Sequence, residues 1–173
     1  MDVAQRLAAR VGEALKQRRF MLVTAESCTG GWVAKVVTSI AGSSTWFDRG
    51  FVTYSNLSKQ EMLDVKAETL KQYGAVSEEV VREMALGALA HSAATVSVTI
   101  SGIAGPEGGT PSKPIGTVCL AWCVRGGTPR SRASHFAGDR AMIRQQAVMA
   151  ALQGILDELA RTESASPASE TTA

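Results

Sequence analysis

The chain has 173 residues with a formal charge of +2, from 18 Lys and Arg against 16 Asp and Glu. This length suits one domain with a core of its own, and because the basic residues are scattered rather than clustered we expect no nucleic-acid partner. The apolar runs are too short to span a membrane and the N-terminus lacks the apolar centre of a signal peptide, so we expect a cytoplasmic protein with no membrane partner.

The first third of the chain is predicted to form a helix, a strand and a second helix. Apolar residues recur at helical spacing, with charges between them, over residues 2–19. Residues 20–24 are a short apolar run typical of a buried strand, and helical spacing resumes over residues 30–40. The tight turn TAESCTGG, residues 24–31, joins that strand to the second helix.

The middle of the chain is predicted to hold a strand and two helices. The sequence RGFVTY, residues 49–54, is rich in β-branched and aromatic residues. Ser58 and Glu61 have the spacing of a capping box, so we expect a short helix to begin there. A further helix should begin near Ser77, after a loop at residues 73–74.

The last part of the chain is predicted to hold three strands and a long helix. Residues 95–100 read as a strand, and the sixteen residues that follow it contain five glycines and three prolines. A connection this long is either functional or mobile. Residues 117–125 and 130–137 should form an antiparallel hairpin, and a final helix should begin near Asp139.

This order of elements indicates an α/β protein, a three-layer α/β/α sandwich with a mixed sheet of about five strands. We expect a single domain over residues 1–161. Residues 162–173 are small, polar and aperiodic, so we expect this tail to be disordered.

Three turns that follow predicted strands carry candidate functional residues: AESCTGG, TYSNLSK and SGIAGPEGG. Ligands of open α/β sheets bind beyond the carboxyl ends of the strands. Lys59 would lie in the first turn of its helix, where the macrodipole disfavours a cation, and we expect its pKa to be lowered. Partial desolvation beside Tyr54 would act in the same direction. A neutral lysine can accept a proton near neutral pH.

These residues suggest nucleophilic catalysis without histidine. Ser27 would be the nucleophile and Lys59 the base, with the phenol of Tyr54 relaying the proton or holding the amine. The reaction class is acyl transfer, most simply hydrolysis of an amide or ester. The expected oxyanion hole consists of backbone N–H groups at the start of a helix: Thr29, Gly30 and Gly31.

Each of these residues also has a structural interpretation. Ser27 could belong to a capping turn, Lys59 could be a solvated surface charge, and Tyr54 could be an ordinary strand aromatic. Glu26 is an alternative base, although its side chain should point to the other side of the strand from that of Ser27. Cys28 is expected to be a packing residue.

We expect no metal and no cofactor. His91 and His135 are far apart in sequence, and no cysteine pair has the spacing of a metal site. Cys119 and Cys123 lie an even number of residues apart in a predicted strand, so they should share one face as small core residues.

The last helix and the glycine-rich loop, residues 101–116, suggest a site that binds an anion. If Asp139 caps the helix, Arg140 lies in its first turn, a poor place for a cation unless it faces a bound anion. The alternative is an Arg140 that extends into solvent. The loop itself matches neither the Walker A motif nor the dinucleotide fingerprint.

Five segments together resemble the C-terminal domain of the CinA family in order and spacing, over about residues 5–160. They are TAESCTGG, AGSSTWFDRGFVTYSN with the following Lys59, YGAVSEEVVREMA, ISGIAGPEGGTPSKPIGTV and GDR. Stand-alone members are nicotinamide-nucleotide amidohydrolases. The resemblance therefore implies hydrolysis of the carboxamide of nicotinamide mononucleotide to nicotinic acid mononucleotide and ammonia, in pyridine-nucleotide salvage.

The resemblance also assigns residues. The family's serine, tyrosine and lysine fall on Ser27, Tyr54 and Lys59. A phosphate role for the glycine loop requires that Glu107 point outward. The small-molecule nucleotide would be held by Gly102, Ala104, Gly105, Gly108, Gly109 and Arg140.

The alternative is a non-catalytic pyridine-nucleotide-binding or regulatory module of the same family. A homodimer is possible in either case. Leu57 stands where an acidic residue is frequent in the family and Asp64 where glycine is frequent, and neither position belongs to the expected catalytic set.

Overall fold

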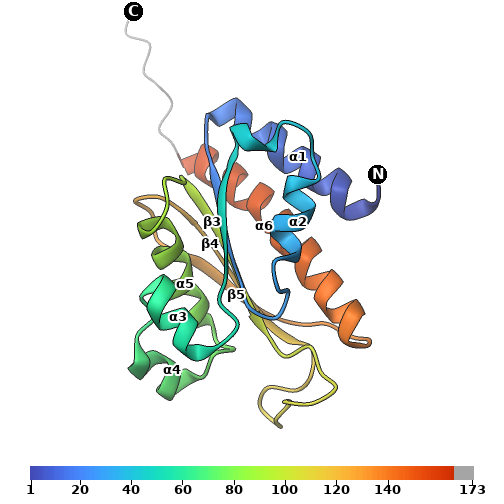
Figure 1. The fold of residues 1–173 in the computed structure, drawn as a ribbon, viewed down its shortest axis with the longest axis vertical. Coiled ribbons are helices and arrows are strands. Elements are labelled where there is room, and N and C mark those ends of the chain that lie inside the picture. The colour runs from blue at the N-terminus through green and yellow to red at the C-terminus, as the bar shows by residue number, and fades with distance from the viewer. Residues whose placement is uncertain (166–173) are drawn as a thin grey trace, which may run out of the picture.

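The computed structural model describes residues 1–165 as a five-stranded mixed sheet between two layers of helices (Figure 1). This confirms the predicted three-layer α/β/α class. The elements in chain order are α1 (Val3–Arg18), β1 (Leu22–Glu26), α2 (Trp32–Thr38), the 3-10 turn η1 (Ser43–Thr45), β2 (Phe47–Val52), α3 (Asn56–Leu63), α4 (Ala67–Tyr73), α5 (Glu78–Ala90), β3 (Val96–Gly102), β4 (Thr117–Val124), β5 (Arg130–His135) and α6 (Arg140–Ala165).

The strand order places the end of β1 at a switch point of the sheet. The order is β2-β1-β3-β4-β5, with β1 parallel to both β2 and β3 and with β4 and β5 antiparallel. The predicted hairpin of β4 and β5 is thereby confirmed. Because β1 has β2 on one side and β3 on the other, its carboxyl end opens into the crevice where open α/β sheets bind ligands.

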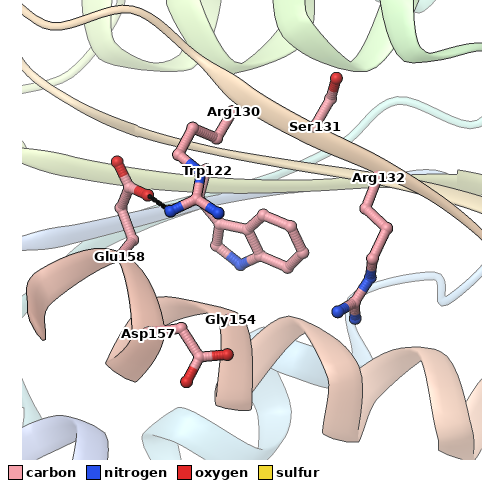
Figure 2. A pocket seen from close by; sticks show the side chains of 7 residues that line it. All are labelled: Trp122, Arg130, Ser131, Arg132, Gly154, Asp157 and Glu158. Carbon is pink, nitrogen blue, oxygen red and sulfur yellow. Dashed lines mark ion pairs between the residues drawn. The ribbon is translucent and has the colours of Figure 1, made fainter. Parts of the chain in front are cut away.

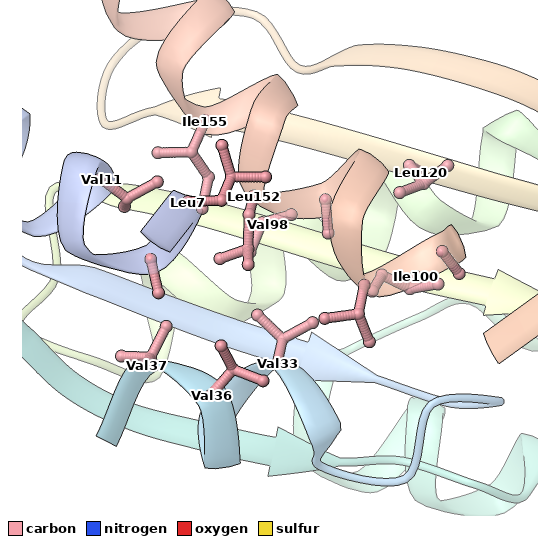
Figure 3. Close-up of a cluster of buried hydrophobic side chains, with 14 of the residues drawn as sticks. Leu7, Val11, Val33, Val36, Val37, Val98, Ile100, Leu120, Leu152 and Ile155 are labelled. Atoms are coloured by element: carbon pink, nitrogen blue, oxygen red, sulfur yellow. The ribbon is translucent and has the colours of Figure 1, made fainter. Parts of the chain in front are cut away.

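Helices α1, α2 and α6 cover one face of the sheet and enclose the larger apolar core. Gly154 of α6 lets the ring of Trp122 lie against the helix, since an added Cβ would come within 2.1 Å of the indole (Figure 2). Figure 3 shows the core between these helices and the strands; the labelled members are Leu7, Val11, Val33, Val36, Val37, Val98, Ile100, Leu120, Leu152 and Ile155.

Helices α3, α4 and α5 cover the opposite face, over a second apolar cluster. Small strand residues fill this cluster, among them Cys119 and Cys123, which confirms their predicted common face. Gly87 of α5 allows close approach to α3, because an added Cβ would lie only 1.8 Å from the carbonyl oxygen of Leu63.

Helix α3 begins earlier than predicted. Its N-cap is Ser55, whose Oγ accepts from the N–H of Ser58, while Ser58 Oγ accepts from the N–H of Ser55. Ser58 thus fills the role expected of Glu61, and Lys59 is the fourth helical residue rather than the first. The helix ends at Asp64, which adopts the left-handed conformation (φ 58°), so α3 and α4 are separate helices.

Helix α6 begins as predicted and runs further. The Oδ1 of Asp139 accepts from the N–H of Met142 at 2.9 Å, which confirms the cap. The helix continues to Ala165, past the expected end of the domain at residue 161. The rest of the expected tail, residues 166–173, lies outside the described residues. No helix of the described part is both long and apolar enough to cross a membrane.

Candidate active site

A cavity of about 200 Å³ opens at the carboxyl ends of β1 and β3. It brings together the three residues predicted to be catalytic and the arginine predicted to bind an anion. The lining residues are Ser27, Cys28, Tyr54, Lys59, Ala75, Val76, Ser101, Gly102, Ala104 and Arg140.

Ser27 and Lys59 meet in this cavity. The Nζ of Lys59 lies 3.1 Å from Ser27 Oγ. Both residues are buried: Lys59 is 1% exposed and Ser27 is 8% exposed. The same Nζ donates to the carbonyl oxygens of Thr53 at 2.8 Å and Tyr54 at 3.4 Å. A neutral amine has two N–H groups and one lone pair, so two carbonyl acceptors leave the lone pair for the serine hydroxyl.

Burial, rather than the helix macrodipole, lowers the pKa of Lys59 below its ordinary value of 10.5. The macrodipole acts mainly within the first turn, and Lys59 lies at its end. A Cys28 thiolate would raise the lysine pKa, but burial raises the pKa of Cys28 itself to about 11. Cys28 is therefore a neutral thiol near pH 7, and it packs in the larger apolar core as predicted.

The turn that carries Ser27 is held by a buried carboxylate. Glu26, 1% exposed, accepts from Thr29 Oγ1 at 2.6 Å and from the N–H groups of Val33 at 2.9 Å and Ala34 at 3.1 Å. Both carboxylate oxygens thus bind the turn and the start of α2. Glu26 does not line the cavity, so its geometry does not suit the alternative role of base.

Arg144 of α6 also holds this turn. Its Nε donates to the carbonyl of Cys28 at 3.0 Å and its terminal nitrogen to that of Thr29 at 3.2 Å. Its guanidinium also lies over the ring of Trp32, 5.4 Å from the centroid. Sequence reasoning missed both Glu26 and Arg144 as supports; a carboxylate at the end of a buried strand, directly before a helix, was the available signal for Glu26.

The predicted oxyanion donors do not line the cavity. Thr29 and Gly31 lie outside the lining, and the N–H of Gly30 donates to the carbonyl of Ser27 at 3.0 Å. At the start of α2 the Glu26 carboxylate accepts from the N–H groups of Val33 and Ala34, so these two N–H groups are not open to a ligand. Within residues 1–165, Cys28 and Ala104 do line the cavity and their N–H groups have no backbone acceptor.

Tyr54 faces Arg140 rather than Lys59 with its phenol. The phenol oxygen accepts from a terminal nitrogen of Arg140 at 3.3 Å, and only the tyrosine carbonyl contacts Lys59. Arg140 also donates to the carbonyl of Gly105 at 2.9 Å. The arginine therefore joins the first turn of α6 to the glycine-rich loop at the mouth of the cavity.

The glycine-rich loop contributes to the cavity through its first residues only. Gly102 and Ala104 line it, whereas Gly105, Gly108 and Gly109 do not. Gly109 packs against Ile115 instead. Glu107 is exposed and does not line the cavity. Its carboxylate therefore does not oppose a phosphate role of this loop.

A separate cavity of about 180 Å³ lies between β5 and α6 (Figure 2). Its buried carboxylate, Glu158, pairs with Arg130 at 3.5 Å and with Arg161 at 2.6 Å. It holds no cysteine or lysine, and its single serine, Ser131, bonds instead to Arg82 and Glu78. Among residues 1–165, no three His, Cys, Asp or Glu side chains gather so that they could hold a metal ion.

Comparison with known proteins gives close relatives for nearly the whole chain. The family model of the CinA C-terminal domain matches residues 4–159. The chain is 58% identical over 147 residues to the nicotinamide-nucleotide amidohydrolase PncC of Escherichia coli K12, covering 85% of this chain and 89% of that protein. It is 49% identical over 156 residues to the protein of the same name from Pseudomonas putida, covering 90% of this chain and 97% of the relative.

The fold has close counterparts among solved structures. The crystal structure of the competence/damage inducible protein CihA from Agrobacterium tumefaciens matches with a TM-score of 0.88 and 43% identity, over 92% of this chain and 97% of that one. A competence-damaged (CinA) superfamily protein from Klebsiella pneumoniae 700603 matches with the same TM-score at 41% identity, over 92% of this chain and 99% of that one.

Proposed function

This chain belongs to the CinA C-terminal domain family, and from that premise we propose that it is an amidohydrolase that converts nicotinamide mononucleotide to nicotinic acid mononucleotide and ammonia. The observation that carries the proposal is the 3.1 Å contact between Ser27 Oγ and Lys59 Nζ inside a cavity. Relatives named for this activity support the choice of substrate. The reaction would serve pyridine-nucleotide salvage in the cytoplasm.

Ser27 Oγ attacks the carboxamide carbon while its proton passes to the neutral amine of Lys59. The carbonyl oxygen gains negative charge, which the N–H groups of Cys28 and Ala104 stabilise. Protonated Lys59 then gives its proton to the leaving nitrogen, and ammonia departs. Water hydrolyses the resulting ester of Ser27, again with Lys59 as base.

Arg140 and the start of the glycine loop bind the nucleotide part of the substrate. Arg140 is the one basic residue besides Lys59 among those that line the cavity, and it lies at the first turn of α6. A phosphate there would be attracted by the guanidinium and by the helix dipole together. Tyr54 holds this arginine through its phenol and holds Lys59 through its carbonyl.

Ammonia release from nicotinamide mononucleotide tests the proposal. We expect wild-type activity and a loss of about a thousandfold or more in Ser27→Ala and in Lys59→Ala, because each change removes a reacting group. Thermal unfolding of the same samples shows whether the variants are folded. Full activity in folded Ser27→Ala would contradict the nucleophile.

The non-catalytic alternative predicts a different result. A binding module would be stabilised against heat by the nucleotide in both wild type and Ser27→Ala, and neither would release ammonia.

A further inference from the structure

One polar side chain in the cavity has no role in the reaction described above. Ser101, the sixth residue of β3, is 1% exposed and lines the cavity. Within residues 1–165 its hydroxyl has no hydrogen-bond partner. Buried hydroxyl groups are usually bonded, so an unpartnered one in a cavity needs an explanation.

Ser101 is the third member of a regular row of hydroxyls on β3. Ser97 Oγ donates to the carbonyl of Ala85 at 3.0 Å, and Thr99 Oγ1 donates to the carbonyl of Val81 at 2.8 Å. Each step of two residues along the strand thus matches a step of four residues back along α5. The next pair would be Ser101 and Ser77.

The row is interrupted because α5 begins at that point. Ser77 is the N-cap of α5, and its own Oγ accepts from Val80 and donates to Gly74. The preceding residues, Ala75 and Val76, also line the cavity. The hydroxyl that would have bonded to a helix carbonyl therefore borders the cavity without a partner among the described residues.

The strand register sets Ser101 beside the nucleophile. In the parallel pairing of β1 and β3, Glu26 lies opposite Ile100, and the N–H of Ser27 donates to the carbonyl of Ile100 at 2.9 Å. One residue further, Ser27 and Ser101 lie side by side and project from the same face. Neighbouring strands are about 4.8 Å apart, so a group that reacts with Ser27 comes within reach of Ser101.

A carboxamide needs an acceptor as well as donors. Its NH₂ group carries two N–H donors, while its oxygen accepts hydrogen bonds from backbone N–H groups in the proposed mechanism. Among the side chains that line the cavity, the Ser27 hydroxyl is bonded to Lys59 and the Tyr54 phenol to Arg140. Ser101 offers the one hydroxyl oxygen there that is not already bonded within the described residues.

We propose that Ser101 Oγ accepts a hydrogen bond from the carboxamide NH₂ of the substrate, and so makes the site specific for an amide over an ester. This inference rests on the proposed function and adds a specificity residue to it. A site built to bond a substrate N–H discriminates strongly against an analogue that lacks it.

The test compares two substrates in matched variants. The substrates are nicotinamide mononucleotide and the same nucleotide with a methyl ester in place of the carboxamide; an ester that is not turned over is measured as a competitive inhibitor. We expect Ser101→Ala to lower kcat/KM for the amide by about 10- to 100-fold and to change kcat/KM or the inhibition constant for the ester by less than about threefold. Ser101→Thr, which keeps a hydroxyl, should restore most of the amide activity.

Ser97→Ala is the matched control, since it removes a buried hydroxyl from the same face of the same strand away from the cavity. It should lower thermal stability and leave both substrates unchanged. An equal loss on amide and ester in Ser101→Ala, or no loss on either, would overturn the inference while wild-type ammonia release upholds the proposed function. Wild-type protein that releases no ammonia would instead contradict the proposed function itself.

Discussion

At the scale of single residues, the charge state of Lys59 governs the proposed reaction. The amine is buried, which disfavours the charged form and lowers its pKa below 10.5. Because only the neutral amine can take the Ser27 proton, we expect the rate of ammonia release to rise with pH and to level off once pH exceeds the pKa of Lys59 in the folded protein. A profile of kcat/KM against pH checks this, with a midpoint expected below 10.5.

The same shift has a consequence for stability. Between the lowered pKa and 10.5 the unfolded chain binds a proton at Lys59 that the folded protein does not, so the free energy of unfolding should rise with pH in that interval. Lys59→Met should remove this dependence. Lys59→Arg keeps a permanent charge and should be inactive throughout, and activity in that variant would exclude the lysine as base.

The pairing of Ser27 with Lys59 could be predicted because both follow strands whose carboxyl ends lie at one edge of the sheet. The contacts that hold this pair in place could not be predicted. Arg144 contacts the Cys28 carbonyl from a residue 116 positions away, and no local pattern encodes such a contact. The donors on Gly30 and Gly31 were expected from a free helix start, but α2 begins at Trp32 and the Glu26 carboxylate binds its second and third N–H groups.

At the scale of elements, the position of α3 matters most, because this short helix carries Lys59, the proposed base. The predicted start at Ser58 was wrong by three residues, since the Ser55 and Ser58 side chains cap each other's N–H groups. A capping box in which serine replaces the usual Glu or Gln is difficult to recognise from sequence. The later break at Asp64 depends on a left-handed residue, which sequence indicates only weakly outside glycine.

The crossing of α3 and α5 at Gly87 offers a test of whether activity depends on the position of α3. An added Cβ would lie 1.8 Å from the Leu63 carbonyl oxygen, so Gly87→Ala must push α3 outward and move Lys59 away from Ser27. We expect a loss of stability of about 1–3 kcal/mol and a fall in kcat of more than tenfold in the protein that remains folded. Steady-state kinetics and thermal unfolding measure the two effects.

Gly154→Ala is the control for that test. Its Cβ would come within 2.1 Å of the Trp122 ring in the other helical layer, so it should also destabilise the fold. It does not act on α3, and kcat per folded molecule should stay close to that of wild type. Equal falls in kcat for the two variants would show that the effect of Gly87→Ala is not a displacement of Lys59.

At the scale of the whole molecule, the alternation of helices and strands was enough to predict the three layers, because each amphipathic helix must cover one face of a sheet. The assignment of helices to faces follows from topology rather than from local sequence. As a result, α2 and α6 support the proposed nucleophile from one layer, while α3 brings the proposed base from the other. The reaction therefore requires both layers to be docked on the sheet.

We expect the layer of α3, α4 and α5 to open before the rest of the molecule, because its apolar cluster is the smaller one and is rich in alanine. In a urea titration, ammonia release should then decline at a lower concentration than the far-ultraviolet circular dichroism of the whole chain. Coincident transitions would show a single cooperative unit instead.

The two clusters also differ in their chromophores. All three tryptophans, Trp32, Trp46 and Trp122, pack with the core of α1, α2 and α6, whereas the layer that delivers Lys59 has none. Intrinsic tryptophan fluorescence is thus a spectroscopic label for one side of the sheet, built in by the sequence. A preparation can keep a native emission spectrum while Lys59 is already displaced, so emission alone does not show that a sample of this protein can carry out the proposed reaction.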